Sequence, residues 1–169
     1  MPRPSVLVSV LLGALAADAG AAGVLMPRDG GAPLPARSHR VEARVEDGLA
    51  RTRLRQTFVN PEDDALEAVY EFPVPEDAAL TGVAFETGGR RFEGLLAEAE
   101  RDGAAGPAAP GPFCPPVSPV LPGEETVVEL TWIRPAPVRG GAVSYAYPLS
   151  LVTDRPSRAK HDFRFTVTL

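Results

Sequence analysis

Residue types that could perform chemistry are few in this chain of 169 residues, and they lie far apart. Cys114 is the single cysteine, and neither His39 nor His161 belongs to a motif that would place an imidazole beside the thiol. A nucleophilic cysteine needs such a base, or another group that stabilises its thiolate. We therefore do not expect Cys114 to be catalytic, and a lone cysteine excludes a disulfide within the chain.

The carboxylates raise the question of metal binding and of acid–base catalysis. Three of them lie in the turn from Asn60 to Asp64, but their spacing does not match a calcium-binding EF-hand loop. No motif places a partner across a cleft from Glu98 and Glu100, or from Glu124 and Glu125. Nucleophile-elbow, zinc-protease, phosphate-loop and dinucleotide-binding motifs are also missing. We therefore predict no catalytic, cofactor-binding or metal-binding residues, and a protein that is not an enzyme.

The basic residues do not predict a nucleic-acid site. The chain has 17 basic and 22 acidic residues, a formal net charge of −5, and no dense block of Lys or Arg. Arg51, Arg53 and Arg55 recur at every second position and would suit an anionic ligand. Glu42 and Glu46 are expected across from them, however, which favours a solvated sheet face laced with both charges.

The N-terminus has the pattern of a cleaved secretory signal peptide over residues 1–21. Arg3 precedes an apolar run from Val6 to Ala17, and small residues suited to signal peptidase follow. The apolar run is shorter than the roughly 20 residues that a membrane-spanning helix needs. We expect residues 22–169 to be exported beyond the cytoplasmic membrane, with no span in the mature chain.

Alternating side chains predict strands through most of the mature chain. Residues 40–46 and 49–59 both have period two, and Asp47-Gly48 between them is typical of a tight type I′ hairpin turn. That turn predicts Val45 opposite Ala50. Further strands are expected at 66–72, 79–86, 91–95, 125–134, 143–149 and 161–169.

Two segments depart from this pattern. Pro73 and Pro75 cannot donate ladder hydrogen bonds, so the strand before them should leave the sheet. The stretch from Gly103 to Gly123 holds seven prolines and is expected to be a long irregular loop. At most one short helix fits, at 97–101. The fold class is therefore mainly β, an antiparallel sandwich of about eight strands.

Three sequence pieces occur in an order that resembles the VIT domain, the module named for vault protein and inter-alpha-trypsin inhibitor heavy chains. They are QTFVNP (56–61), EAVYEFPVP (67–75) and LPGE (121–124). The resemblance covers Gly23 to Leu169. In bacterial relatives the domain typically follows a signal peptide and precedes a von Willebrand A domain. The D-x-S-x-S metal motif of a von Willebrand A domain is not found in these 169 residues.

The resemblance implies a non-catalytic, exported module for protein interaction or scaffolding. Its protein partner is unknown, and a separate von Willebrand A-domain protein is one candidate. Exposed aromatic side chains would form the interaction surface, for which we name Tyr70, Phe72 and Trp132; the alternative for each is packing in the core.

Two other functions stay open at this point. The first is an extracytoplasmic glycan-binding sandwich in which Trp132, Tyr145 or Tyr147 stacks on sugar, and it requires these rings to be exposed. The second is a hydrolase built on the loop from Gly103 to Gly123, and it requires a deep pocket that holds Cys114 beside a His or Asp.

Overall fold

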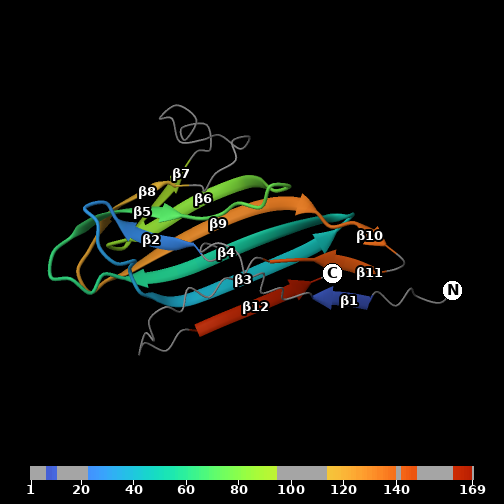
Figure 1. The fold of residues 1–169 in the computed structure, drawn as a ribbon, viewed down its shortest axis with the longest axis horizontal. Coiled ribbons are helices and arrows are strands. Elements are labelled where there is room, and N and C mark those ends of the chain that lie inside the picture. The colour runs from blue at the N-terminus through green and yellow to red at the C-terminus, as the bar shows by residue number, and fades with distance from the viewer. Residues whose placement is uncertain (1–6, 11–22, 95–113, 140–141, 148–161, 169) are drawn as a thin grey trace.

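The computed structural model describes residues 7–10, 23–94, 114–139, 142–147 and 162–168. Strands account for most of these residues and none of them is helical, so the predicted mainly-β fold is confirmed (Figure 1). The strands are β1 (Leu7–Val10), β2 (Val24–Pro27), β3 (Ala36–Glu46), β4 (Leu49–Val59), β5 (Leu66–Glu71), β6 (Ala79–Thr87), β7 (Arg90–Gly94), β8 (Pro116–Val120), β9 (Glu125–Pro135), β10 (Val138–Arg139), β11 (Ala142–Tyr145) and β12 (Asp162–Thr168).

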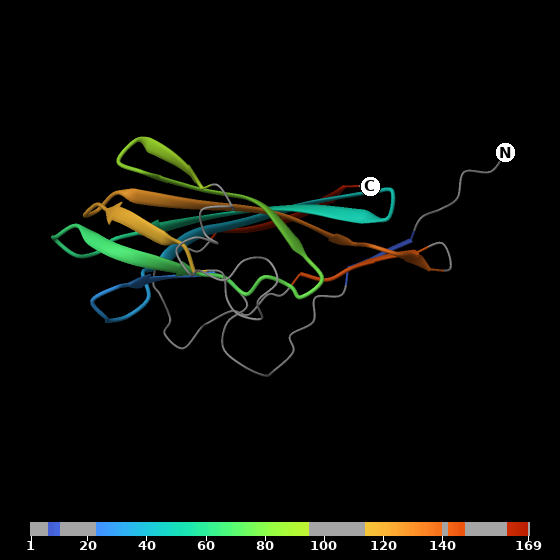
Figure 2. The same ribbon diagram turned by 90° about the horizontal axis from the view of Figure 1, so that it is seen from above.

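The strands pack as a sandwich. A six-stranded sheet in the order β12-β3-β4-β9-β6-β7 forms one layer, and the sheet β2-β5-β8 lies against it as a second layer (Figure 2). A small sheet, β1-β11-β10, continues from one end. Two pairs are parallel, β12 with β3 and β1 with β11, which the alternation of side chains did not indicate. Of the expected signal peptide, only β1 lies within the described residues.

The hairpin of β3 and β4 has the predicted register. Val45 lies opposite Ala50, and Val41 lies opposite Leu54. Asp47 and Gly48 have φ values of 53° and 76°, as the type I′ turn requires at both central positions. This turn therefore fixes which side chains of two eleven-residue strands face the core.

The Pro73–Pro75 segment behaves as predicted, and the strands expected at 79–86 and 91–95 pair as a second hairpin. β5 ends at Glu71, before the prolines, and pairing resumes in β6 at Ala79. The β6–β9 register shifts between Leu80 and Gly82, which marks a β-bulge at this point of the strand. A two-residue turn then joins β6 to β7, with Thr87 opposite Arg90.

The irregular loop predicted from Gly103 to Gly123 is wrong in its last third. Pro116–Val120 forms β8, which pairs with β5 and buries Val117 and Val120. Proline is tolerated there because β8 lies at the edge of its sheet, where a missing N–H leaves no ladder partner unpaired. Residues 103–113 and the short helix expected at 97–101 lie outside the described residues.

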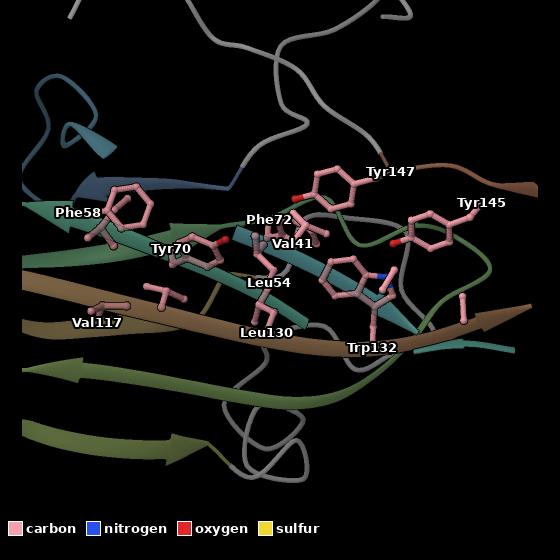
Figure 3. Packing of buried hydrophobic residues seen from close by; sticks show 14 of the residues in the cluster. Val41, Leu54, Phe58, Tyr70, Phe72, Val117, Leu130, Trp132, Tyr145 and Tyr147 are labelled. Carbon is pink, nitrogen blue, oxygen red and sulfur yellow. The ribbon is translucent and has the colours of Figure 1, made fainter. Parts of the chain in front are cut away.

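The main core lies between the two large sheets (Figure 3). Leu54 and Leu130 point inward from the six-stranded sheet, and Tyr70 and Val117 point inward from the opposite sheet. All four side chains are buried. The strand expected at 125–134 is confirmed as β9, and its residue Leu130 faces the core. The polar members of these strands face either the core network or the outer surface described below.

Candidate functional site

The aromatic side chains named as an interaction surface lie in the core. Tyr70, Phe72 and Trp132 are each at most 1% exposed. The Tyr70 and Phe72 rings stack, and the centroid of Phe72 lies 5.3 Å from that of Trp132. The predicted surface is therefore wrong, because strand alternation directs all three side chains into the space between the sheets, where they exclude water.

The rings invoked for glycan binding are buried as well. Tyr145 and Tyr147 are covered, and the Tyr147 ring stacks on Trp132 at 6.2 Å between centroids. The Tyr145 hydroxyl lies 2.7 Å from Thr52 Oγ1, an internal hydrogen bond. Because a sugar ring can stack only on an accessible aromatic face, the glycan hypothesis loses the residues on which it depended.

Cys114 precedes β8 and is half-buried. Partial burial, and secondarily the negative charge of Glu71, raises the pKa of its thiol. A raised pKa keeps sulfur in the protonated form at neutral pH, whereas a nucleophilic cysteine needs its thiolate. The thiol environment therefore gives no support to the hydrolase hypothesis.

A buried polar network connects both layers through the side chain of Gln56, on β4. Gln56 Nε2 donates to the carbonyl oxygen of Gly23 at 3.0 Å and to His39 Nδ1 at 3.1 Å. Gln56 Oε1 accepts a hydrogen bond from the Tyr70 hydroxyl. Gln56, His39 and Tyr70 are at most 2% exposed, so these bonds satisfy groups that would be costly to bury alone.

The network continues through the imidazole to Tyr147. Since His39 Nδ1 accepts from the Gln56 amide, the ring proton lies on Nε2, which is 2.9 Å from the Tyr147 hydroxyl. Burial raises the pKa of Tyr147, with a smaller contribution from Tyr145. Burial likewise raises the pKa of Tyr70. Both phenols are therefore neutral hydrogen-bonding groups and not bases.

Gly23 closes the network at its N-terminal end. A Cβ atom at this position would lie 1.9 Å from the Tyr70 hydroxyl oxygen and 2.6 Å from Gln56 Oε1. Such contacts are far below van der Waals separation, so a larger residue would displace the side chains that the network joins. The chain before β2 is thus fitted closely against β4 and β5.

Asn60, in the turn after β4, also has a structural role. Its amide nitrogen donates to the carbonyl oxygens of Asp64 and Val120, and its Oδ1 accepts from the backbone N–H of Glu62 at 3.0 Å. The backbone N–H of Gly123 in turn donates to the Asn60 carbonyl at 2.9 Å. The QTFVNP and LPGE pieces of the sequence are therefore joined directly in space by this residue.

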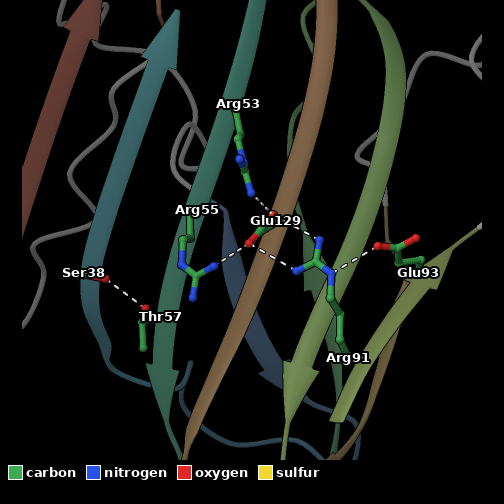
Figure 4. Close-up of polar contacts among 7 residues, drawn as sticks. All are labelled: Ser38, Arg53, Arg55, Thr57, Arg91, Glu93 and Glu129. Carbon is green, nitrogen blue, oxygen red and sulfur yellow. Dashed lines mark hydrogen bonds and ion pairs between the residues drawn. The ribbon is translucent and has the colours of Figure 1, made fainter. Parts of the chain in front are cut away.

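On the opposite side of the six-stranded sheet, a single carboxylate is surrounded by arginines (Figure 4). Glu129, on the central strand β9, lies 2.7 Å from Arg53 Nη2 and 2.5 Å from Arg55 Nη1. Arg91 of β7 donates from both terminal nitrogens at 3.3 Å. The Glu129 side chain is only 7% exposed, whereas the three guanidinium groups are 40–55% exposed. We call these four residues the Glu129 cluster.

The electrostatics of the cluster favour an ionised Glu129. Burial by itself would raise the pKa of this carboxyl, but hydrogen bonds and charge interactions with Arg91 and Arg53 outweigh it and lower the pKa from 4.5 to about 2. Charge-assisted hydrogen bonds from guanidinium groups produce this effect. The cluster therefore carries one negative and three positive charges at neutral pH.

Replacing Glu129 by Gln is expected to lower the free energy of unfolding by about 2 kcal/mol at neutral pH. The folded-state pKa is depressed, so the ionised carboxylate stabilises the fold above pH 4.5 and loses this contribution as the pH falls toward 2. Denaturant melts of both proteins across this range measure the difference, which should shrink on acidification. A difference that does not change with pH would contradict the ionic role of Glu129.

The buried polar contacts of Glu129, His39 and Gln56 were not predicted from the sequence. A signal was available for Glu129, which is the one charged residue between Thr126 and Trp132 in a strand that otherwise reads as core. A lone carboxylate that is buried in such a run needs a cationic or hydrogen-bonding partner. His39 and Gln56 gave no comparable signal, because their partners lie on other strands and, for Gly23, outside any strand.

The described part of the chain provides neither a cluster of metal-ligating side chains nor a membrane-spanning helix. No group of three or more His, Cys, Asp or Glu side chains in it is placed to hold a metal ion. None of its segments forms a helix long and apolar enough to cross a membrane.

Comparison with protein families matches residues 36–109 to the Vault protein inter-alpha-trypsin domain, or VIT domain. The matched region begins at β3 and includes Gln56, Asn60 and Tyr70, whose side chains hold the two layers and the turn after β4 together. A search of curated proteins gives no match to the chain.

Proposed function

The chain contains a VIT domain, and from this premise we propose that it acts as a non-catalytic, exported module for protein interaction or scaffolding. A division between the two sides of the six-stranded sheet supports the proposal. On the inner side, Gln56 and Tyr70, which belong to two of the VIT-like sequence pieces, hydrogen-bond to one another. On the outer side, exposed charged side chains alternate along β3 and β4.

The outer face suits recognition of another macromolecule. β3, β4 and β9 each extend over eleven residues, so the face is broad, and the Glu129 cluster holds its central side chains in place. Rigid, alternating charges select partners by complementarity and steer their approach. An active site would instead be built around a concave pocket with convergent polar groups.

Export is part of the proposal and is supported by the signal-peptide pattern of residues 1–21. N-terminal sequencing of the protein recovered from the secreted or periplasmic fraction of its own host tests this step. A mature terminus near residue 22 is expected. Recovery of the intact chain from the cytoplasm would contradict export without bearing on the interaction.

The interaction itself is tested by capture from the same extracytoplasmic fraction. Tagged mature chain should retain a defined protein, and an excess of untagged chain should compete for it. A separate von Willebrand A-domain protein is one candidate for the retained species. A heat-unfolded sample serves as the control, and capture that is missing, or that is equal for folded and unfolded chain, would contradict an interaction function.

A further inference from the structure

Three arginines lie side by side across the outer face of the six-stranded sheet. Arg164 of β12 is opposite Arg40 of β3, and Arg40 is opposite Arg55 of β4. Like charges at directly opposed positions destabilise a sheet. We call these residues the arginine row; its members come from three different strands, so it is a property of the sheet and not of one segment.

A shallow depression opens beside the row, lined by Arg40, Glu42, Arg53 and Arg55. Two of these arginines are held by Glu129, at 2.7 Å for Arg53 and 2.5 Å for Arg55. Each nevertheless keeps about half of its side chain exposed. Their guanidinium groups are therefore positioned before any ligand arrives, which reduces the entropy that binding would cost.

Positive charge exceeds negative charge at this place. Among the side chains that the structure describes here, the arginine row and Arg53 supply four guanidinium groups, and Glu42 and Glu129 supply two carboxylates, an excess of two positive charges. The whole chain has a net charge of −5. The depression is thus a positive site on a negative protein, and a negative group bound there would relieve the repulsion within the row.

We propose that this depression binds carboxylate side chains of an acidic segment of a partner protein. Guanidinium groups match the planar carboxylate and can bind it through two parallel hydrogen bonds. Glu42 and Glu46 interrupt the positive charge along β3, so the face does not offer the continuous basic track that a uniformly charged polyanion would follow. The assignment deepens the proposed function and rests on it, because it takes the partner to be a protein.

Isothermal titration calorimetry of the mature chain with a synthetic Glu-rich peptide tests the assignment. The titration is run at low and at moderate salt. The same peptide with Gln at every Glu position is the ligand control. Arg40→Ala should weaken binding about tenfold. Arg28→Ala is the protein control: Arg28 is also exposed, and it pairs with Glu67 beside β2, on the other sheet.

A second variant separates this site from general damage to the protein. Glu42→Gln removes the negative charge from the depression and should strengthen peptide binding about threefold. A destabilised protein would not show such a gain. Thermal melts of every variant confirm that each is folded at the temperature of the titration.

The assignment is overturned if the Glu-rich peptide does not bind, if Arg40→Ala and Arg28→Ala weaken binding equally, or if Glu42→Gln weakens it. Binding of a sulfated polysaccharide in place of the peptide would also overturn it. These outcomes leave the capture experiment above unaffected, so a protein partner bound elsewhere on the molecule would remain detectable even if this site fails.

Discussion

Replacement of Gln56 by Leu is expected to lower the free energy of unfolding by about 3–5 kcal/mol. The substitution keeps a side chain of similar size but removes both polar ends. The Gly23 carbonyl, His39 Nδ1 and the Tyr70 hydroxyl then lose their partner together. Each is buried where water cannot easily replace the lost bond, and an orphaned buried group costs about 1–3 kcal/mol.

Urea denaturation of the variant measures this loss of stability. The Tyr70→Phe variant, which loses only one of the three hydrogen bonds, is measured for comparison. That second change removes only the hydroxyl that donates to Gln56 and should cost about 1–2 kcal/mol. Since Gln56 has two further partners, its replacement should cost clearly more. Equal losses for Gln56→Leu and Tyr70→Phe would show that the other two hydrogen bonds contribute nothing.

Replacement of Trp132 by Ala is expected to cost about 3–5 kcal/mol, because it opens a cavity between the two layers. The indole is buried and packs against the rings of Phe72 and Tyr147. Among the described residues, the indole N–H has no hydrogen-bond partner. Trp132→Phe should therefore cost much less than Trp132→Ala, since it keeps most of the packing and loses no hydrogen bond.

Leu49→Ala is the matched control, because Leu49 is a large apolar residue of the same sheet that is 50% exposed. It should change the free energy of unfolding by less than about 0.5 kcal/mol. Urea melts of the three variants give the ranking directly. A Trp132→Ala variant as stable as Leu49→Ala would contradict the placement of the indole in the core.

The parts of the fold that depend on neighbouring residues could be predicted from the sequence. Asp47-Gly48 determines the hairpin of β3 and β4, because a two-residue turn with positive φ leaves one register for the strands on either side. The prolines after Glu71 end β5 for an equally local reason, the missing N–H. Local chemistry of this kind requires no knowledge of distant segments.

The pairing of distant segments could not be predicted in the same way. β12 lies parallel to β3, although more than a hundred residues separate them along the chain. β8 pairs with β5 despite Pro116 and Pro119, because the missing N–H of a proline is tolerated in a strand at the edge of a sheet. The identity of a strand's neighbours decides both cases, and alternation within one strand carries no information about them.

The candidate sites show the same limit. Trp132 lies in a strand that alternation predicts, but which face of that strand is covered depends on the opposite sheet. The stripe of Arg51, Arg53 and Arg55 was recognised as a charged outer face. Glu129, the carboxylate that binds two of these arginines, was not recognised, because it reaches them only through the pairing of β4 with β9.

Whether the aromatic side chains form the interior, and so leave recognition to the charged outer face, is tested most directly by the fluorescence of Trp132, the single tryptophan of the chain. Its emission should be that of an indole in apolar surroundings, and iodide should hardly quench it until the protein is unfolded in urea. Emission typical of water-exposed indole, quenched in the native protein as strongly as free tryptophan, would contradict this arrangement.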